Sequence, residues 1–216
     1  MNTTLKVCLL AISLPVCLVR AEIIRTDVNP QVPVLRDEQG KYILKDGGIY
    51  TVSGTIDGDI EGHGDIGVRM SGGTVINGCV DLQYSSSSRT RRVPRIWIDY
   101  TCRATINNSG KIALQTGRYR PTFIEYCGTL TVNGNVSGSV QITDGGTTLI
   151  VQGEINDGFA YLNKETWLRV KGPIQEGVEI RAEYDRRGNE ANITNSYTTE
   201  GDYRVYYGGD VPEFEP

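Results

Sequence analysis

The chain has 216 residues, a formal net charge of −4, 26 glycines and a single histidine. This length is enough for one domain with a substantial core. The mild acidity argues against a general nucleic-acid binder, which needs a basic face, and no cysteine or histidine spacing suits a zinc site.

Residues 1–21 have the pattern of an export signal. Lys6 supplies a short positive start, and Val7–Val19 is apolar but too short to span a bilayer. The segment ends in small or modest side chains that predict cleavage after Ala21. Without it, 20 cations face 26 anions, a net charge of −6. We therefore expect a periplasmic, cell-surface or secreted protein without a transmembrane segment.

Residues 22–48 carry two prolines and a charged run and lack the period of the chain that follows them. We expect them to form an N-terminal cap. From residue 49 a phrase recurs: a short alternating strand, a polar glycine corner, one β-branched residue, a second corner and another short strand. The clearest copies are Leu130–Ile142, Leu149–Leu162 and Leu168–Ile180, whose central Gly134, Gly153 and Gly172 are 19 residues apart.

Earlier copies are looser and carry insertions. They are Ile49–Ile60 around Gly54, Gly73–Leu82 around Gly78, and Ala104–Leu114 with Asn107-Asn108 at the corner. One such unit cannot bury its own apolar edge, so the copies must stack. Six copies predict a solenoid of about six coils over residues 49–182. The expected strands are Tyr50–Val52, Thr74–Ile76, Ile96–Ile98, Phe123–Glu125, Thr129–Val132, Thr148–Val151, Trp167–Val170 and Val178–Ile180.

After Ala182 the repeat dissolves, so residues 183–216 are expected to be a C-terminal cap and tail. This segment holds five tyrosines that could cover the last coil: Tyr184, Tyr197, Tyr203, Tyr206 and Tyr207. A cap is needed because an open solenoid end exposes strand edges that pair with other chains.

The fold class predicted by this pattern is an all-β, single-stranded parallel β-helix. Its coil length and irregular loops resemble the right-handed β-helices of the pectate-lyase-like class, a resemblance that implies right-handed winding. The shorter VxGxI-type phrase also resembles bactofilins, filament-forming bacterial scaffolds that lack an export signal. Both resemblances cover roughly residues 49–182 and rest on repeat style rather than on a catalytic signature.

Three cysteines follow the export signal: Cys79, Cys102 and Cys127. Ile98–Cys102 (IDYTC) and Ile124–Cys127 (IEYC) look like one phrase repeated a coil apart, with one residue inserted. Neighbouring strands lie ~4.8 Å apart, within reach of a disulfide. In an oxidising compartment we expect a Cys102–Cys127 disulfide with Cys79 free. The alternative is an unbonded internal stack of thiols.

Two basic segments are the strongest candidates for a binding site. Ser85–Arg95 (SSSSRTRRVPR) and Gln115–Pro121 (QTGRYRP) each end just before a similar strand. If the strands stack, a basic patch forms from Arg89, Arg91, Arg92, Arg95, Arg118 and Arg120, with Tyr119 among them. Guanidinium groups bind carboxylate or sulfate bidentately, so the patch suits an acidic polysaccharide. The alternative is a surface ladder in which the arginines pair with Asp99 and Glu125.

Metal and catalytic signals are weaker. Asp157 and Glu176 fall at equivalent corners and are candidate calcium ligands; no other cofactor is expected. His63 lies in a glycine-rich corner without a nucleophile motif. If the protein is an enzyme, Asp99 and Glu125 are the pair to test as acidic residues of a polysaccharide lyase or glycosidase.

The sequence thus favours an exported structural or binding β-solenoid at the cell envelope or surface, with an acidic glycan or another envelope protein as its partner. Two alternatives stay open. One is a small polysaccharide lyase or glycosidase, and the other is a self-assembling filament or scaffold protein.

Overall fold

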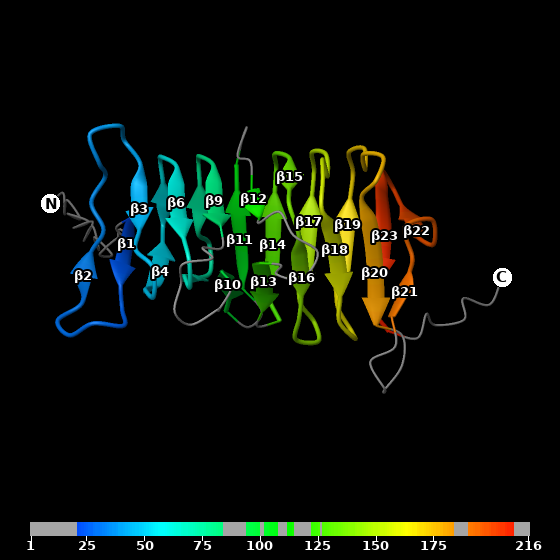
Figure 1. Ribbon diagram of the computed structural model, residues 1–216, viewed down its shortest axis with the longest axis horizontal. Helices are drawn as coiled ribbons and strands as arrows, with labels where there is room; N and C mark the ends of the chain where they lie inside the picture. The colour runs from blue at the N-terminus through cyan, green and yellow to red at the C-terminus, as the bar shows by residue number, and fades with distance from the viewer. Residues whose placement is uncertain are drawn as a thin grey trace, which may run out of the picture.

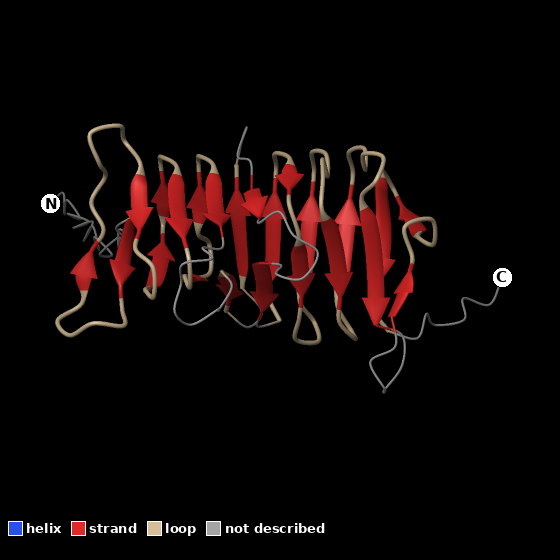
Figure 2. Ribbon diagram, viewed as in Figure 1, coloured by secondary structure: helices blue, strands red, loops and turns tan. Residues whose placement is uncertain are grey.

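The computed structural model describes residues 21–83, 94–99, 102–107, 112–114, 122–125, 127–183 and 190–209. All regular structure in these ranges is β-strand, and the strands form three sheets along one elongated body (Figures 1 and 2). Among the described residues there is no helix of the length and apolarity needed to cross a membrane.

The three sheets contain the following strands of the described ranges, each in spatial order. Sheet A is β2 (Val32–Pro33), β1 (Glu22–Arg25), β4 (Ile49–Ser53), β7 (Gly67–Met70), β10 (Arg95–Ile98), β13 (Thr122–Glu125), β16 (Val140–Ile142), β18 (Phe159–Leu162), β20 (Glu179–Glu183) and β21 (Glu190–Asn192). Sheet C is β22 (Thr198–Glu200), β23 (Tyr203–Tyr207), β19 (Trp167–Val170), β17 (Thr148–Val151), β14 (Thr129–Val132), β11 (Arg103–Ile106), β8 (Val75–Ile76) and β5 (Thr55–Ile56). Sheet B is β15 (Val136–Ser137), β12 (Ile112–Leu114), β9 (Val80–Gln83), β6 (Ile60–His63) and β3 (Tyr42–Leu44).

The chain passes through the sheets in a fixed order. From β4 to β17 it visits sheets A, C and B in turn, and each strand pairs in parallel with the next strand of its own sheet. Single parallel bridges, Val136 to Ile155 and Ile155 to Ile174, extend sheet B beyond β15. We call one passage through the three sheets a rung. This winding is compatible with a β-helix.

The core lies between the sheets and consists of β-branched and leucine side chains in register. Because side chains alternate across a strand, every second residue points inward and stacks on its counterpart in the next rung. One such row in sheet A is Val68, Ile96, Ile124, Ile142, Leu162 and Ala182, all essentially buried. Each large apolar side chain removed from water in this way stabilises the fold by roughly 1.5–3 kcal/mol.

The corner after sheet C requires glycine because successive rungs approach closely there. A Cβ on Gly78 would lie 2.3 Å from the carbonyl oxygen of Gly58, and one on Gly172 would lie 2.1 Å from that of Gly153. Such distances exclude a side chain. The first predicted copy is therefore displaced by four residues, since Ile56 pairs with Ile76 and Gly58, not Gly54, is the counterpart of Gly78.

Antiparallel strands lie at both ends of the parallel sheets. At the N-terminal end β1 pairs with β4 and β2 pairs with β1. At the C-terminal end β21 pairs with β20, while β23 pairs with β19 and is followed by β22. Figure 1 shows these two groups at opposite ends of the long axis.

Candidate functional site

The outer face of sheet A carries a row of polar and aromatic side chains in register. Paired strands align Gly67, Arg95, Phe123, Gln141, Tyr161 and Arg181 in one row, and Arg69, Trp97 and Glu125 in the next. These residues alternate with the buried row of the core, so they point away from it. We call the part on β7, β10 and β13 the sheet A platform.

Glu125 is the most enclosed charged group of the platform. The Trp97 indole Nε1 donates a hydrogen bond of 2.6 Å to Glu125 Oε2, and Arg95 Nη1 lies 3.6 Å from Oε1. The Glu125 side chain is only 13% exposed. Both carboxylate oxygens thus face donors from the neighbouring strand, so Glu125 holds the platform together.

Two aromatic rings complete the platform. A Cβ on Gly67 would lie 2.4 Å from the Trp97 ring, so only glycine at this position leaves room for the indole. The Arg95 guanidinium carbon lies 5.4 Å from the centroid of the Phe123 ring, a cation–π distance. The platform thus combines an indole, a phenyl and a guanidinium group.

Asp99 is the more available of the two acidic residues. Its side chain is 46% exposed, and Arg69 Nε approaches its Oδ1 at 3.7 Å. The register places Trp97, not Asp99, opposite Glu125. The predicted alignment of Ile98 with Ile124 is therefore wrong, because Ile96 is the partner of Ile124. Asp99 and Glu125 lie diagonally on the platform.

The predicted arginine ladder is formed in part. Arg95 pairs with Glu125, and Asp99 pairs with Arg69, which the sequence interpretation had not selected. Arg89, Arg91, Arg92, Arg118, Arg120 and Tyr119 lie outside the described residues.

Both basic segments nevertheless enter sheet A side by side. The backbone N–H of Phe123 donates to the carbonyl of Pro94 at 3.1 Å, at the start of the β10–β13 pairing. Pro94 is the last residue but one of the first basic segment (Ser85–Arg95), and Thr122 directly follows the second. Because β10 and β13 are parallel, the two segments lead into the same ends of two neighbouring strands of the platform.

None of the three cysteines of the described residues is part of a disulfide, so the predicted Cys102–Cys127 disulfide is not formed in the structure. A Cβ on Gly72, in the preceding rung, would lie 3.0 Å from Cys102 Sγ. Cys127 Sγ instead lies 2.7 Å from the carbonyl oxygen of Gly145, in the following rung. The two thiols point in opposite directions because β11 pairs Arg103 with Thr129, which sets Cys102 beside Gly128.

No group of three or more histidine, cysteine, aspartate or glutamate residues within the described ranges could hold a metal ion. Asp157 and Glu176 do fall at equivalent positions, because Ile155 bridges Ile174. Asp157 Oδ1, however, accepts a hydrogen bond from the backbone N–H of Gly138. One carboxylate oxygen of Asp157 is thus engaged by the backbone of the corner itself.

Hydrogen-bonded side-chain ladders were missed from the sequence. At the corner after sheet C, Asn77 donates to Asp57 at 2.7 Å, Asn107 to Asn77 at 3.0 Å and Asn133 to Asn107 at 2.6 Å. The signal that could have revealed this ladder is an amide or carboxylate directly after each β-branched strand end. Likewise, alternation in Arg95-Ile-Trp97-Ile-Asp99 could have placed Trp97 on the platform.

Comparison of the chain with family models, curated proteins and solved structures finds no match. The interpretation of function therefore rests on the platform and on the two ends of the molecule.

Proposed function

We propose that this protein is an exported, right-handed single-stranded β-helix of about six coils that binds an acidic glycan at the cell envelope or surface. Its binding site is the sheet A platform together with the arginine-rich segments that enter it. The observation that carries the proposal is the pairing of β10 with β13, which begins at Pro94 and Phe123. The two basic segments, which carry Arg89, Arg91, Arg92, Arg95, Arg118 and Arg120, directly precede or enter these two paired strands in the sequence, and the proposal gathers their guanidinium groups on this side of sheet A.

The chemistry of the platform supports a sugar acid rather than a neutral sugar. Guanidinium forks bind carboxylate and sulfate with two parallel hydrogen bonds. Trp97 and Phe123 offer aromatic faces for the apolar side of sugar rings. Arg95 and Arg69 have carboxylate partners, so the proposal assigns the ligand contacts to Arg89, Arg91, Arg92, Arg118 and Arg120.

A direct test replaces Arg91, Arg92, Arg118 and Arg120 together by serine. The wild-type protein should bind an acidic polysaccharide more tightly than a neutral one, and its affinity should fall with salt because exposed charges are screened over ~10 Å at 0.1 M. The variant should lose this binding with little change in Tm, since surface substitutions usually cost less than ~0.5 kcal/mol each.

A matched control is Arg181→Ser, on the same sheet face but engaged by Glu179 and Glu190. It should retain glycan binding. Unaltered binding in the quadruple variant would contradict the proposed site. A large loss of stability would instead favour a purely structural role for these arginines.

The competing proposal is a polysaccharide lyase or glycosidase that uses Asp99 and Glu125. This proposal has less support because the two carboxylate oxygens of Glu125 already face the Trp97 indole and the Arg95 guanidinium. An enzyme of the lyase type would release unsaturated products that absorb in the ultraviolet, and Asp99→Asn would abolish that signal. A binding protein releases none.

A further inference from the structure

The N-terminal end of the molecule contains an apolar cleft of about 600 Å³ between the β1–β2 hairpin and strands β3 and β4. Its lining includes Val28, Val32, Leu35 and Ile43, with Arg25 and Lys45 as the charged members. We call it the N-terminal cleft. Its size is that of an ordinary ligand site.

The cleft exposes apolar side chains that the fold itself does not cover. Five large hydrophobic side chains of the described residues are exposed, and three of them, Val32, Leu35 and Ile43, line this cleft. Leu35 is 79% exposed. Clustered apolar exposure of this kind marks an interaction site.

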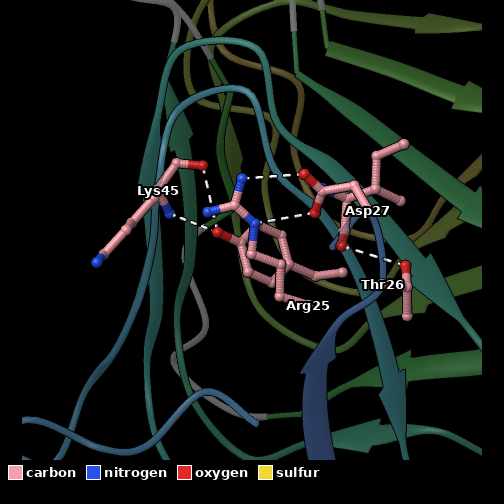
Figure 3. Close-up of polar contacts among 6 residues, drawn as sticks. Arg25, Thr26, Asp27 and Lys45 are labelled. Carbon is pink, nitrogen blue, oxygen red and sulfur yellow. Dashed lines mark hydrogen bonds and ion pairs between the residues drawn. The ribbon is translucent and has the colours of Figure 1, made fainter. Parts of the chain in front are cut away.

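The charges around the cleft favour an acidic occupant. Among the described residues, its lining contains two cations and no carboxylate. Arg25 is held by Asp27 through two hydrogen bonds of 2.9 Å, and Ile49 N–H also donates to Asp27 (Figure 3). Lys45 offers its backbone N–H to Tyr50 Oη at 2.7 Å, while its side chain is exposed. The available cation is therefore Lys45.

This chain contains a segment with the matching chemistry. Residues 210–216 read DVPEFEP, in which Val211 and Phe214 alternate with Asp210, Glu213 and Glu215. The segment follows Gly209, two residues after the end of β23, and β23 lies at the end of the molecule opposite β1 and β2 (Figure 1). It combines apolar side chains for the cleft with carboxylates for Lys45.

The segment cannot fill the cleft of its own molecule. Gly209 packs beside Lys164, in the turn that follows β18. Six strand spacings of ~4.8 Å, about 29 Å, separate β18 from β1 in sheet A. Phe214 is five residues beyond Gly209 and can reach only about 17 Å from it. A second copy must therefore provide the segment.

We propose that residues 210–216 of one copy dock in the N-terminal cleft of the next, with Phe214 among Val32, Leu35 and Ile43 and the acidic side chains near Lys45. Because donor and acceptor lie at opposite ends of the long axis, the contact is head-to-tail and produces a row of molecules rather than a closed pair. This inference does not depend on glycan binding.

The direct experiment titrates a fluorescent peptide of residues 208–216 into the protein that lacks residues 210–216, with anisotropy as the readout. We expect saturable one-to-one binding and none with a scrambled peptide. Phe214→Ala in the peptide should weaken binding by at least about tenfold, as expected for one buried aromatic ring. Leu35→Ser in the protein should weaken it comparably, and since Leu35 is exposed this variant should fold normally.

Charge complementarity is tested by exchange. Lys45→Glu should weaken binding by roughly three- to tenfold, in keeping with an exposed charge contact. A peptide with Glu213→Lys and Glu215→Lys should recover affinity for this variant. Lys171→Glu is the control, because Lys171 pairs with Asp202 away from the cleft and should have no effect on binding.

Sedimentation velocity over a concentration series should show self-association of the full chain that is lost on deletion of residues 210–216. The four-arginine variant should associate normally, which separates this inference from the proposed function. Failure of the peptide to bind, or binding unchanged by Leu35→Ser, would overturn the proposal. Association that depends on residues 1–20 instead would assign the cleft to that apolar segment and overturn it as well.

Discussion

The two ends of this molecule are covered to different extents by the chain itself. At the C-terminal end, β23 and β22 lie antiparallel beside β19, and Trp167 packs on Tyr207 with ring centroids 5.0 Å apart. At the N-terminal end, only sheet A is continued by antiparallel strands, and sheets B and C end on β3 and β5 among the described strands.

The exposed apolar side chains follow the same division. Four of the five large ones among the described residues lie between residues 32 and 49, and the fifth is Tyr197. The last strand of a parallel sheet is protected from pairing with other chains when an antiparallel strand lies beside it. The C-terminal end meets this condition in sheets A and C, while at the N-terminal end the described residues leave several apolar side chains exposed.

The largest expected effect comes from opening the C-terminal cap. Tyr206 is 1% exposed, and its hydroxyl donates to the carbonyl of Thr194 at 3.2 Å. Tyr206→Ala should lower the free energy of unfolding by about 3–5 kcal/mol, as for other buried aromatic residues. Chemical denaturation followed by far-ultraviolet circular dichroism measures this loss.

Tyr197 provides the control for that change. It is exposed, and its ring packs on Tyr206 with centroids 5.6 Å apart. Tyr197→Ala should cost only the aromatic pair, about 0.5–1.5 kcal/mol. Equal losses in the two variants would show that the C-terminal end is not closed by Tyr206.

A second pair of substitutions sharpens the comparison within the N-terminal end. Leu44 in β3 is 2% exposed and belongs to the core, whereas Leu35 lines the open cleft. Leu44→Ala should destabilise the protein by about 2–5 kcal/mol. Leu35→Ala should change stability by less than ~0.5 kcal/mol. Thermal unfolding of the two variants measures the difference, and a large loss at Leu35 would mean that the cleft is part of the fold.

Much of the repeat could be predicted from the sequence. The expected strands Thr129–Val132, Thr148–Val151 and Trp167–Val170 coincide with β14, β17 and β19, which are paired in parallel. They could be predicted because alternation and a constant 19-residue spacing both specify the register there. The earlier rungs carry insertions, so similar phrases such as IDYTC and IEYC matched at the wrong residue.

The candidate site was less predictable for a physical reason. The sequence identified Arg95 and Glu125 as charged candidates, but their contact depends on the length of the chain between sheets A and C, which differs by two residues in successive rungs. Arg103 comes six positions after Trp97, whereas Thr129 comes four positions after Glu125. Local sequence does not encode that difference. The N-terminal cleft was missed because residues 22–48 have no repeat, so nothing indicated which of their apolar side chains stay exposed.

The smallest expected effect concerns the ion pair beside the cleft. The Arg25 guanidinium, with the Ile49 N–H, lowers the pKa of Asp27 to about 2, from an ordinary value of about 3.9. A depressed folded-state pKa stabilises the fold above the unfolded value, and this contribution is lost as pH falls from about 4 towards 2. The side chains are 26% and 22% exposed, so the contribution should not exceed ~1 kcal/mol.

Asp27→Asn should therefore lower stability at pH 7 and reduce the loss between pH 4 and pH 2, relative to wild type. Arg25→Gln should remove the same increment, and the double variant should lose no more than either single one, because the two residues act as a pair. Tyr50, the other titratable group beside them, stays neutral throughout because burial raises its pKa. Urea unfolding at pH 7, 4, 3 and 2 measures each increment. Additive losses would show that Arg25 and Asp27 stabilise this end independently, and that the cleft is shaped by the hairpin backbone rather than by the ion pair.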